Sequence, residues 1–205
     1  MAQVKYTKSA LREEQIKLSQ LQKYLPTLQL KKAMLQLEIN QTLGEADHLQ
    51  KSLDTKGKRV EDYSQLLTAS GADSLFDACE VHTVHKRFEN IAGVEIPIFE
   101  EIIFEEADYF LFDTPVWLES GIEGVRELIE VRERRIILLE KVRLLQKELR
   151  EVSIRVNLFE KIMIPRTEEN IKRIKIFLGD QQLAAVSQAK VAKRKIVSRK
   201  LKKAS

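Results

Sequence analysis

Apolar residues between about Lys8 and Leu67 recur with a period of seven, which is the pattern of a helix that packs against another helix. With Leu11 at position a of the heptad, the a sites are Leu11, Leu18, Leu25, Lys32, Ile39, Ala46, Leu53, Val60 and Leu67, and the d sites are Glu14, Leu21, Leu28, Leu35, Thr42, Leu49, Lys56 and Tyr63. All a sites except Lys32 are apolar, and so are most d sites. The pattern predicts one long helix with a single apolar stripe, which we expect Pro26 and Gly44 to bend.

The chain from about Glu119 onward repeats this pattern. One series of sites is Val131, Leu138, Leu145, Val152 and Phe159, and the other is Leu128, Arg135, Val142, Leu149, Val156 and Met163. At Pro165 the frame slips by one residue, and the stripe then continues through Ile164, Ile171, Ile174, Leu178, Ala185 and Ala192. An extra residue in a heptad has to be absorbed by local unwinding or bending, and a proline inside a helix costs about 3 kcal/mol. We therefore expect the second helix to change its winding at Pro165.

The middle of the chain, roughly 70–118, has a different composition. It holds most of the phenylalanines, the only tryptophan (Trp117), and Gly71, Gly93, Pro97 and Pro115. EVHTVHKRF (80–88) is rich in residues that favour strands, and VEIPIFEEIIF (94–104) reads as a second extended run after the turn-like ENIAG. These features predict a β-hairpin between the two helical arms.

The expected fold is dominated by α-helix. Arms 1–69 and 119–205 would pair as a long antiparallel two-helix coiled coil, joined by the hairpin-bearing segment 70–118, and the C-terminal arm would be the longer one. A composition with 32% charged residues, 6% aromatic residues and little glycine or proline agrees with long helices. The single cysteine, Cys79, excludes an intramolecular disulfide and favours a reducing compartment. The sequence has neither an apolar run long enough to span a bilayer nor a signal-peptide core.

Motifs for catalysis or cofactor binding are missing from the sequence, so we expect no catalytic, cofactor or metal site. There is no P-loop, no G-x-S-x-G, no paired CxxC and no glycine-rich dinucleotide turn. His82 and His85 have the spacing of a metal pair, but positions i and i+3 of a strand face opposite sides, which favours ordinary exposed histidines. Cys79 is expected to be a small buried apolar residue. The acidic residues Glu100, Glu101, Glu105, Glu106 and Asp108 fit a cation site less well than a solvated surface that faces a partner.

Residues 190–205 (KVAKRKIVSRKLKKAS) are basic and contain no acidic residue. Three interpretations are open: a solvated helix end that opposes the helix dipole, contact with an acidic protein cavity, or nucleic-acid binding. The absence of interleaved aromatic residues makes the third the weakest.

Two stretches resemble the D subunit of the V-type/A-type ATPases, a family of central-stalk rotor subunits. RVNLFEKIMIPRTEENIKRIKIFL (155–178) is similar to the family's Arg-Val-Asn, Leu-Glu, Ile-Pro-Arg and Ile-Lys-x-Ile run, and NIAGVEIP (90–97) is similar to its middle segment. LQLKKAML (28–35) is a weaker match, with Gln29 and Ala33 where the family has a lysine and an acid.

The resemblance implies a non-catalytic shaft that turns inside the A–B catalytic ring and couples ATP hydrolysis or synthesis to proton or sodium translocation. It implies the F subunit and the subunit that links to the membrane ring as further partners, only indirect contact with the membrane, no nucleic acid, and a cytoplasmic location peripheral to the inner membrane. The implied partner-contact residues are Ile91, Gly93, Val94 and Pro97 in the middle segment, Arg155, Asn157, Pro165 and Arg166 in the C-terminal motif, and Lys193, Arg194 and Lys195 in the basic tail.

Two other functions are compatible with the helical pattern itself. A free-standing antiparallel coiled-coil tether or adaptor would have the same heptads, and a nucleic-acid-binding helical hairpin would have the same basic tail. Only the two motif stretches separate these from the rotor shaft, and they favour the rotor.

Overall fold

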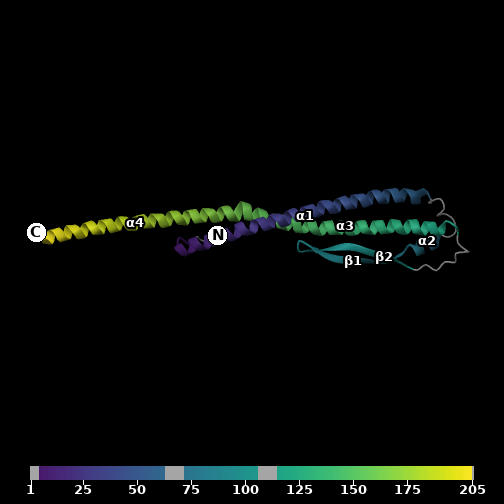
Figure 1. The fold of residues 1–205 in the computed structure, drawn as a ribbon, viewed down its shortest axis with the longest axis horizontal. Coiled ribbons are helices and arrows are strands. Elements are labelled where there is room, and N and C mark those ends of the chain that lie inside the picture. Colours follow the sequence, from purple (N-terminus) through teal and green to yellow (C-terminus); the bar gives the residue numbers. More distant parts are fainter. Residues whose placement is uncertain (1–4, 63–71, 106–114, 205) are drawn as a thin grey trace. The chain divides into compact units, whose positions relative to one another are not determined.

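A computed structural model describes residues 5–62, 72–105 and 115–204. Along the chain lie α1 (Lys8–Asp62), α2 (Ala72–Ala78), β1 (Val81–Ile91), β2 (Val94–Phe104), α3 (Leu118–Leu158), the π-helical turn η2 (Phe159–Met163) and α4 (Ile164–Ala204) (Figure 1). The predicted long helices and central hairpin are confirmed. Of the predicted positions, Tyr63, Leu67, Glu106 and Asp108 lie outside the described residues.

The chain divides into two compact units. One comprises Met1–Leu30 with Ser153–Ser205, and the other Lys31–Val152. In each unit a segment of α1 packs against a segment of the second helical arm, so both units have the same two-helix core.

The predicted heptad sites form this core. Every described a and d site of α1 is buried or partly buried, and so is every site of both series in α3 and η2. Among them, Leu35 and Leu145 have no exposed surface, and Ile174 on α4 has none either. A stripe that is sustained over this many heptads can be buried only against another stripe, which is why the helices pair.

The start of α1 has an identifiable cap. The hydroxyl oxygen of Thr7 accepts a hydrogen bond from the backbone N–H of Ala10, as an N-cap residue does. The helix then runs to Asp62 without interruption, through Pro26 and Gly44. In the same unit, the ring of Tyr6 lies 5.0 Å from the ring of Phe177 on α4.

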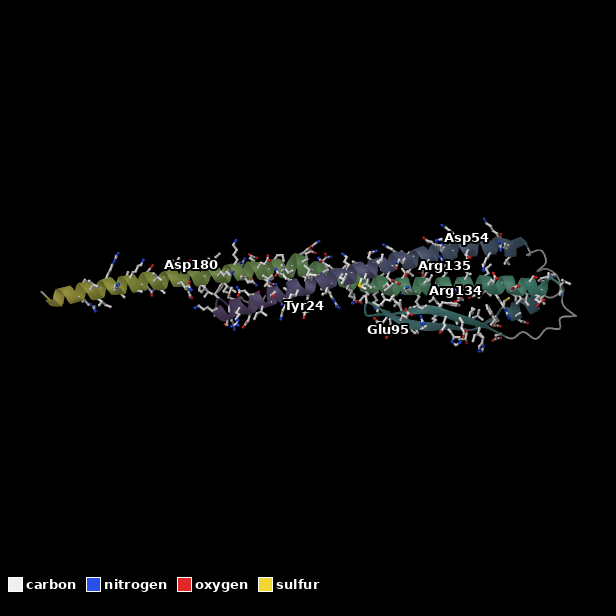
Figure 2. All side chains as sticks on the ribbon, in the orientation of Figure 1. Tyr24, Asp54, Glu95, Arg134, Arg135 and Asp180 are labelled. Carbon is white, nitrogen blue, oxygen red and sulfur yellow. The ribbon has the colours of Figure 1, made fainter. Side chains whose placement is uncertain are left out.

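The hairpin β1–β2 is antiparallel and has irregularities in its register next to Val81 and His85. It packs along α3, as Figure 1 also shows. The guanidinium of Arg126 lies over the ring of Phe104, and that of Arg134 over the ring of Phe99, at 5.0 and 4.8 Å. Figure 2 labels Arg134 on α3. Cation–π contacts and the buried Ile96 thus hold the sheet against the helix.

Candidate functional site

Pro165 lies two residues beyond the last residue of the π-helical turn, Met163. The backbone N–H of Ile164 donates to the carbonyl of Phe159, five residues back, where an α-helix would use the carbonyl four residues back. A π turn adds one residue to the helical repeat, which is the amount by which the heptad frame slips at this point. The wider turn also relieves the clash between a proline ring and the carbonyl four residues before it. The predicted change of winding is confirmed, and its form is a π turn.

A groove of about 530 Å³ opens beside this turn in the first unit. Leu158, Ile162 and Arg166 line it from the second arm, and Glu13 and Glu14 from α1. One carboxylate oxygen of Glu14 is buried and has no hydrogen-bond partner among the described residues. A buried polar group without a partner at a heptad core position weakens the seam at this point.

The predicted C-terminal motif residues surround the same turn. Arg155 and Asn157 are exposed near the end of α3, and Pro165 and Arg166 are exposed at the start of α4. The buried Thr167 donates its hydroxyl to the carbonyl of Met163 at 2.8 Å, which adds a bond at the junction. The motif therefore presents an exposed face over a locally rewound helix.

Ile91, Gly93 and Val94, three of the four predicted residues of the middle segment, lie at the hairpin tip. Ile91 pairs with Val94 across a turn whose two central residues, Ala92 and Gly93, have φ of 52° and 82°. Positive φ at both positions is what a tight type I′ hairpin turn requires. The N–H of Gly93 donates to the side-chain oxygen of Asn90 at 2.9 Å.

Pro97 lies away from this tip. It pairs with Phe88 across the sheet and is buried, whereas Phe88 is 65% exposed. Any partner that approaches this part of the hairpin would meet Phe88 before it met Pro97.

Residues 180–199 of α4 are exposed throughout, including Ala185 and Ala192 of the extended stripe. Lys193, Arg194 and Lys195 lie here, and Asp180 marks where the exposed stretch begins (Figure 2). The end of α4 is a basic helical surface that no described residue covers.

Sequence reasoning missed the ion pairs that join the two arms within the second unit. Lys31 contacts Glu148, and Lys141 contacts Glu38, both at 2.6 Å. Heptad phase could have shown that these residues flank the core, but it could not have matched them to one another.

A third pair of this kind joins Lys56 and Glu127 at 2.6 Å. The hydrogen bond from Lys56, together with its charge, lowers the pKa of the Glu127 carboxyl, and the charge of Arg59 acts in the same direction.

The structure also shows the surroundings of His82, His85 and Cys79, for which the sequence favours no metal or reactive site. His82 and His85 are both exposed, and the structure brings no group of three or more histidine, cysteine or acidic residues together within the part of the chain that it describes. Cys79 is buried in a cluster with Leu75, Ala78, Leu118 and Ile122. Its neighbour Arg126, which the sequence did not reveal, donates two hydrogen bonds to the carbonyl of Ala78. None of the described helices is long and apolar enough to cross a bilayer.

Comparison with known proteins gives a consistent result. The family profile described as that of the ATP synthase D subunit matches residues 10–194. The V-type ATP synthase D subunit of Chlamydia abortus is 41% identical over 200 residues, which cover 97% of this chain and 96% of that protein.

Two further relatives carry the same name. The protein of Chlamydia pneumoniae is 41% identical over 199 residues, covering 97% of this chain and 95% of its own length. That of Chlamydia trachomatis serovar L2 is 39% identical over 200 residues, covering 97% of this chain and 98% of its own length. The similarity spans both arms and the hairpin.

Proposed function

Since the chain belongs to the family of the ATP synthase D subunit, the central-stalk subunit of the rotary V-type ATPases, we propose that it is the shaft that couples ATP hydrolysis or synthesis in the A–B ring to proton or sodium translocation. The chain has no catalytic role of its own in this proposal. ATP chemistry belongs to the ring, and ion transport to the membrane part of the complex.

The observation that carries the proposal is the family match over residues 10–194, and the packed seam of the two arms suits the mechanical role of a shaft. A shaft has to transmit torque without its helices unwinding or sliding. The heptad sites are buried or partly buried in both units as far as Leu178, and the helix that supplies one side of both seams is continuous from Lys8 to Asp62. Interdigitated core side chains at close-packed density resist such sliding.

The proposed partners are those that the resemblance to the family implies, and the exposed surfaces are the places where we propose that they bind. The basic end of α4, with Lys193, Arg194 and Lys195, would enter the ring as a bearing. The hairpin tip, with Ile91, Gly93 and Val94, would lie on the side of the subunit that links to the membrane ring, and the F subunit would bind along the coil. The complex would hold the chain at the cytoplasmic face of the inner membrane.

The π turn has a mechanical role in this proposal. Three catalytic sites have to meet different faces of one shaft, and a shaft of uniform winding presents the same relation between its two stripes everywhere. The extra residue that the π turn absorbs keeps the apolar stripe aligned across the turn, and it changes the direction in which Arg166 projects relative to Arg155 from that of an unbroken α-helix.

Co-purification with the A, B and F subunits of the same organism tests the proposal. The chain is expected in one copy per ring. A variant that lacks residues 190–205 is expected to lose ring association, because the exposed basic helix is removed.

The matched control keeps the helix length and removes charge, by replacing Lys193, Arg194 and Lys195 with glutamine. If this variant binds and the truncation does not, the helix rather than its charge is the bearing. If the full chain does not associate with nucleotide-loaded A and B subunits, with or without the F subunit, the shaft assignment is wrong.

The free-standing tether is not favoured, because the family match covers both arms and the hairpin. The two functions respond differently to a flexible glycine–serine insertion in the middle of α1. A tether would keep its binding, whereas a shaft would lose the coupling of ATP hydrolysis to ion transport.

A further inference from the structure

Four charged residues flank the core of the second unit in a specific order. Lys31 and Glu38 lie seven residues apart on α1, and Lys141 and Glu148 lie seven residues apart on α3. Because the helices are antiparallel, Lys31 meets Glu148 and Glu38 meets Lys141. In each of the two helices, one position of the repeat is positive and the next is negative.

This order makes neighbouring registers unfavourable. If the helices slid by one heptad in one direction, Lys31 would face Lys141. If they slid by one heptad in the other direction, Glu38 would face Glu148. The first shift also brings Glu38 opposite Arg134, and the second also brings Lys31 opposite Arg155 and Lys141 opposite Glu45. Either shift therefore replaces two attractive pairs by a set that contains at least one repulsive pair.

The apolar core discriminates much less between these registers. A shift of seven residues brings heptad sites back onto heptad sites, and most of them are apolar on both helices. The information that selects one alignment therefore has to come from residues beside the core or from polar residues within it.

The burial of the pairs suits them to this task. The side chains of Lys141 and Glu38 are only 11% and 23% exposed, and those of Lys31 and Glu148 30% and 26%. Charges that are screened less by solvent discriminate more strongly between like and unlike neighbours. The pair Lys56–Glu127 is more exposed, at 32% and 54%, and contributes less.

The hairpin tip lies at one of the pairs. The Nζ of Lys31 is 3.9 Å from the position that a Cβ on Gly93 would occupy. The tip thus rests against the lysine that bridges the two arms, and a shift of the helices would displace this contact as well.

We propose that Lys31, Glu38, Lys141 and Glu148 are positioning residues that lock the register of the two arms against sliding by a heptad. A shaft under load needs such a lock, since a seam with a seven-residue repeat would otherwise have equivalent resting positions about 10 Å apart.

Charge reversal tests the lock without removing the pairs. In Glu38→Lys/Lys141→Glu the native pair is restored with opposite polarity, but both charged sites of α1 are now positive and both of α3 are negative. With the flanking charges Glu45, Arg134 and Arg155 replaced by glutamine in every variant, sliding by one heptad in either direction then still places a positive side chain of α1 opposite a negative side chain of α3. The quadruple reversal, which adds Lys31→Glu and Glu148→Lys, restores the alternation and so the discrimination.

The readout is the distance between two spin labels in the full chain. Labels at Lys51→Cys and Lys147→Cys, both exposed positions, report the alignment in a Cys79→Ala background. The unaltered charges should give one distance, the double reversal should add populations displaced by about 10 Å, and the quadruple reversal should return to one distance. Reversal of the pair Glu169–Arg173, which lies within α4, is the matched control and should leave one distance.

Two results would overturn the lock. A single native distance in the double reversal would show that the core or the hairpin sets the register without these charges. Multiple distances in both the double and the quadruple reversals would show that the substitutions disturb the coil in some other way. The distance measurement does not depend on the proposed function, whereas ATPase coupling in the assembled complex tests the shaft itself, so the two can fail separately.

Discussion

The N–H of Ile164 donates to the carbonyl of Phe159, and this bond absorbs the one residue by which the two halves of the apolar stripe are out of frame. Two causes converge on the turn. Pro165 has no N–H to donate and needs room for its ring, and the stripe needs one additional residue before it can continue at Ile171 and Ile174.

These causes can be separated by mutation. Pro165→Ala restores a donor and should raise the free energy of unfolding by about 0.5–1.5 kcal/mol, the net value of one hydrogen bond, because the π turn already relieves the clash of the proline ring. The π turn should nevertheless persist, since the two frames still differ by one residue. Deletion of the exposed Lys161 in the same background should convert 159–163 to α-helix.

Backbone chemical shifts of 156–170, together with urea unfolding, measure both effects. If Pro165→Ala removes the π turn without the deletion, the proline alone causes it, and the frame slip is a consequence. Deletion of Lys175, in the uniformly α-helical part of α4, serves as the control. It should move the apolar stripe beyond it out of alignment and leave the π turn in place.

The turn at the hairpin tip gives predictions of opposite sign at adjacent positions. Ala92 has a φ of 52°, which costs a residue with a side chain about 1 kcal/mol, so Ala92→Gly or Ala92→Asn should stabilise the hairpin by up to about that amount. Gly93→Ala imposes the same strain at a φ of 82° and should destabilise by about 1–2 kcal/mol. Thermal unfolding of the three variants measures the differences. If Gly93→Ala proves neutral, the turn does not have the positive φ that the pairing of Ile91 with Val94 demands.

Much of the fold could be predicted because heptad positions repeat their information. Most sites of the two arms indicate the same stripe, so polar exceptions such as Lys32 and Arg135 do not alter the prediction. The hairpin was predictable for another reason, since strand-forming residues flank a turn that contains Gly93.

The rest depends on contacts between distant residues. The pattern indicates one extra residue near Pro165 but not whether a kink, a looser turn or a π turn absorbs it. The sequence shows which face of each helix is apolar. It does not show how the two helices are aligned along their length, because a shift of seven residues again places heptad sites opposite heptad sites. Arg126 on α3 donates to the carbonyl of Ala78 on α2 and lies over the ring of Phe104 on β2. These residues are far apart in the sequence, so no local pattern predicts the contacts.

Two helical glycines should respond in opposite ways to the same substitution. A Cβ at Gly44 would meet nothing within 4 Å, so Gly44→Ala should stabilise α1 by about 0.5–1 kcal/mol through helix propensity. A Cβ at Gly121 would lie 3.0 Å from the buried Leu75 and 3.5 Å from the ring of Trp117. Crowding there should cancel the propensity gain and leave Gly121→Ala about 1–2 kcal/mol less stable than Gly44→Ala. Equal melting temperatures for the two variants would mean that the side chains around Leu75 can move aside and accommodate the added methyl group.

Cys79 reports on that same cluster. Its side chain is buried at 7% exposure, and burial raises the pKa of the thiol above the ordinary value, against the opposing effect of the Arg126 charge. Because the thiolate is the reactive form and the thiol is covered, a neutral alkylating reagent should modify the folded chain at least about 100-fold more slowly than the urea-unfolded chain at the same pH. Equal alkylation rates for the two states would show that the cluster of α2 and α3 does not enclose the thiol.

The raised pKa of Cys79 also predicts how stability depends on pH, because the folded state holds this proton more tightly than the unfolded state. The thiol's contribution to stability is therefore complete below the unfolded pKa and is lost as the pH rises through the folded pKa. Urea unfolding between about pH 7 and pH 11 should accordingly show a steeper loss of stability in the native sequence than in Cys79→Ala, which lacks the titrating group. Parallel pH profiles for the two proteins would mean that folding leaves the proton affinity of the thiol unchanged.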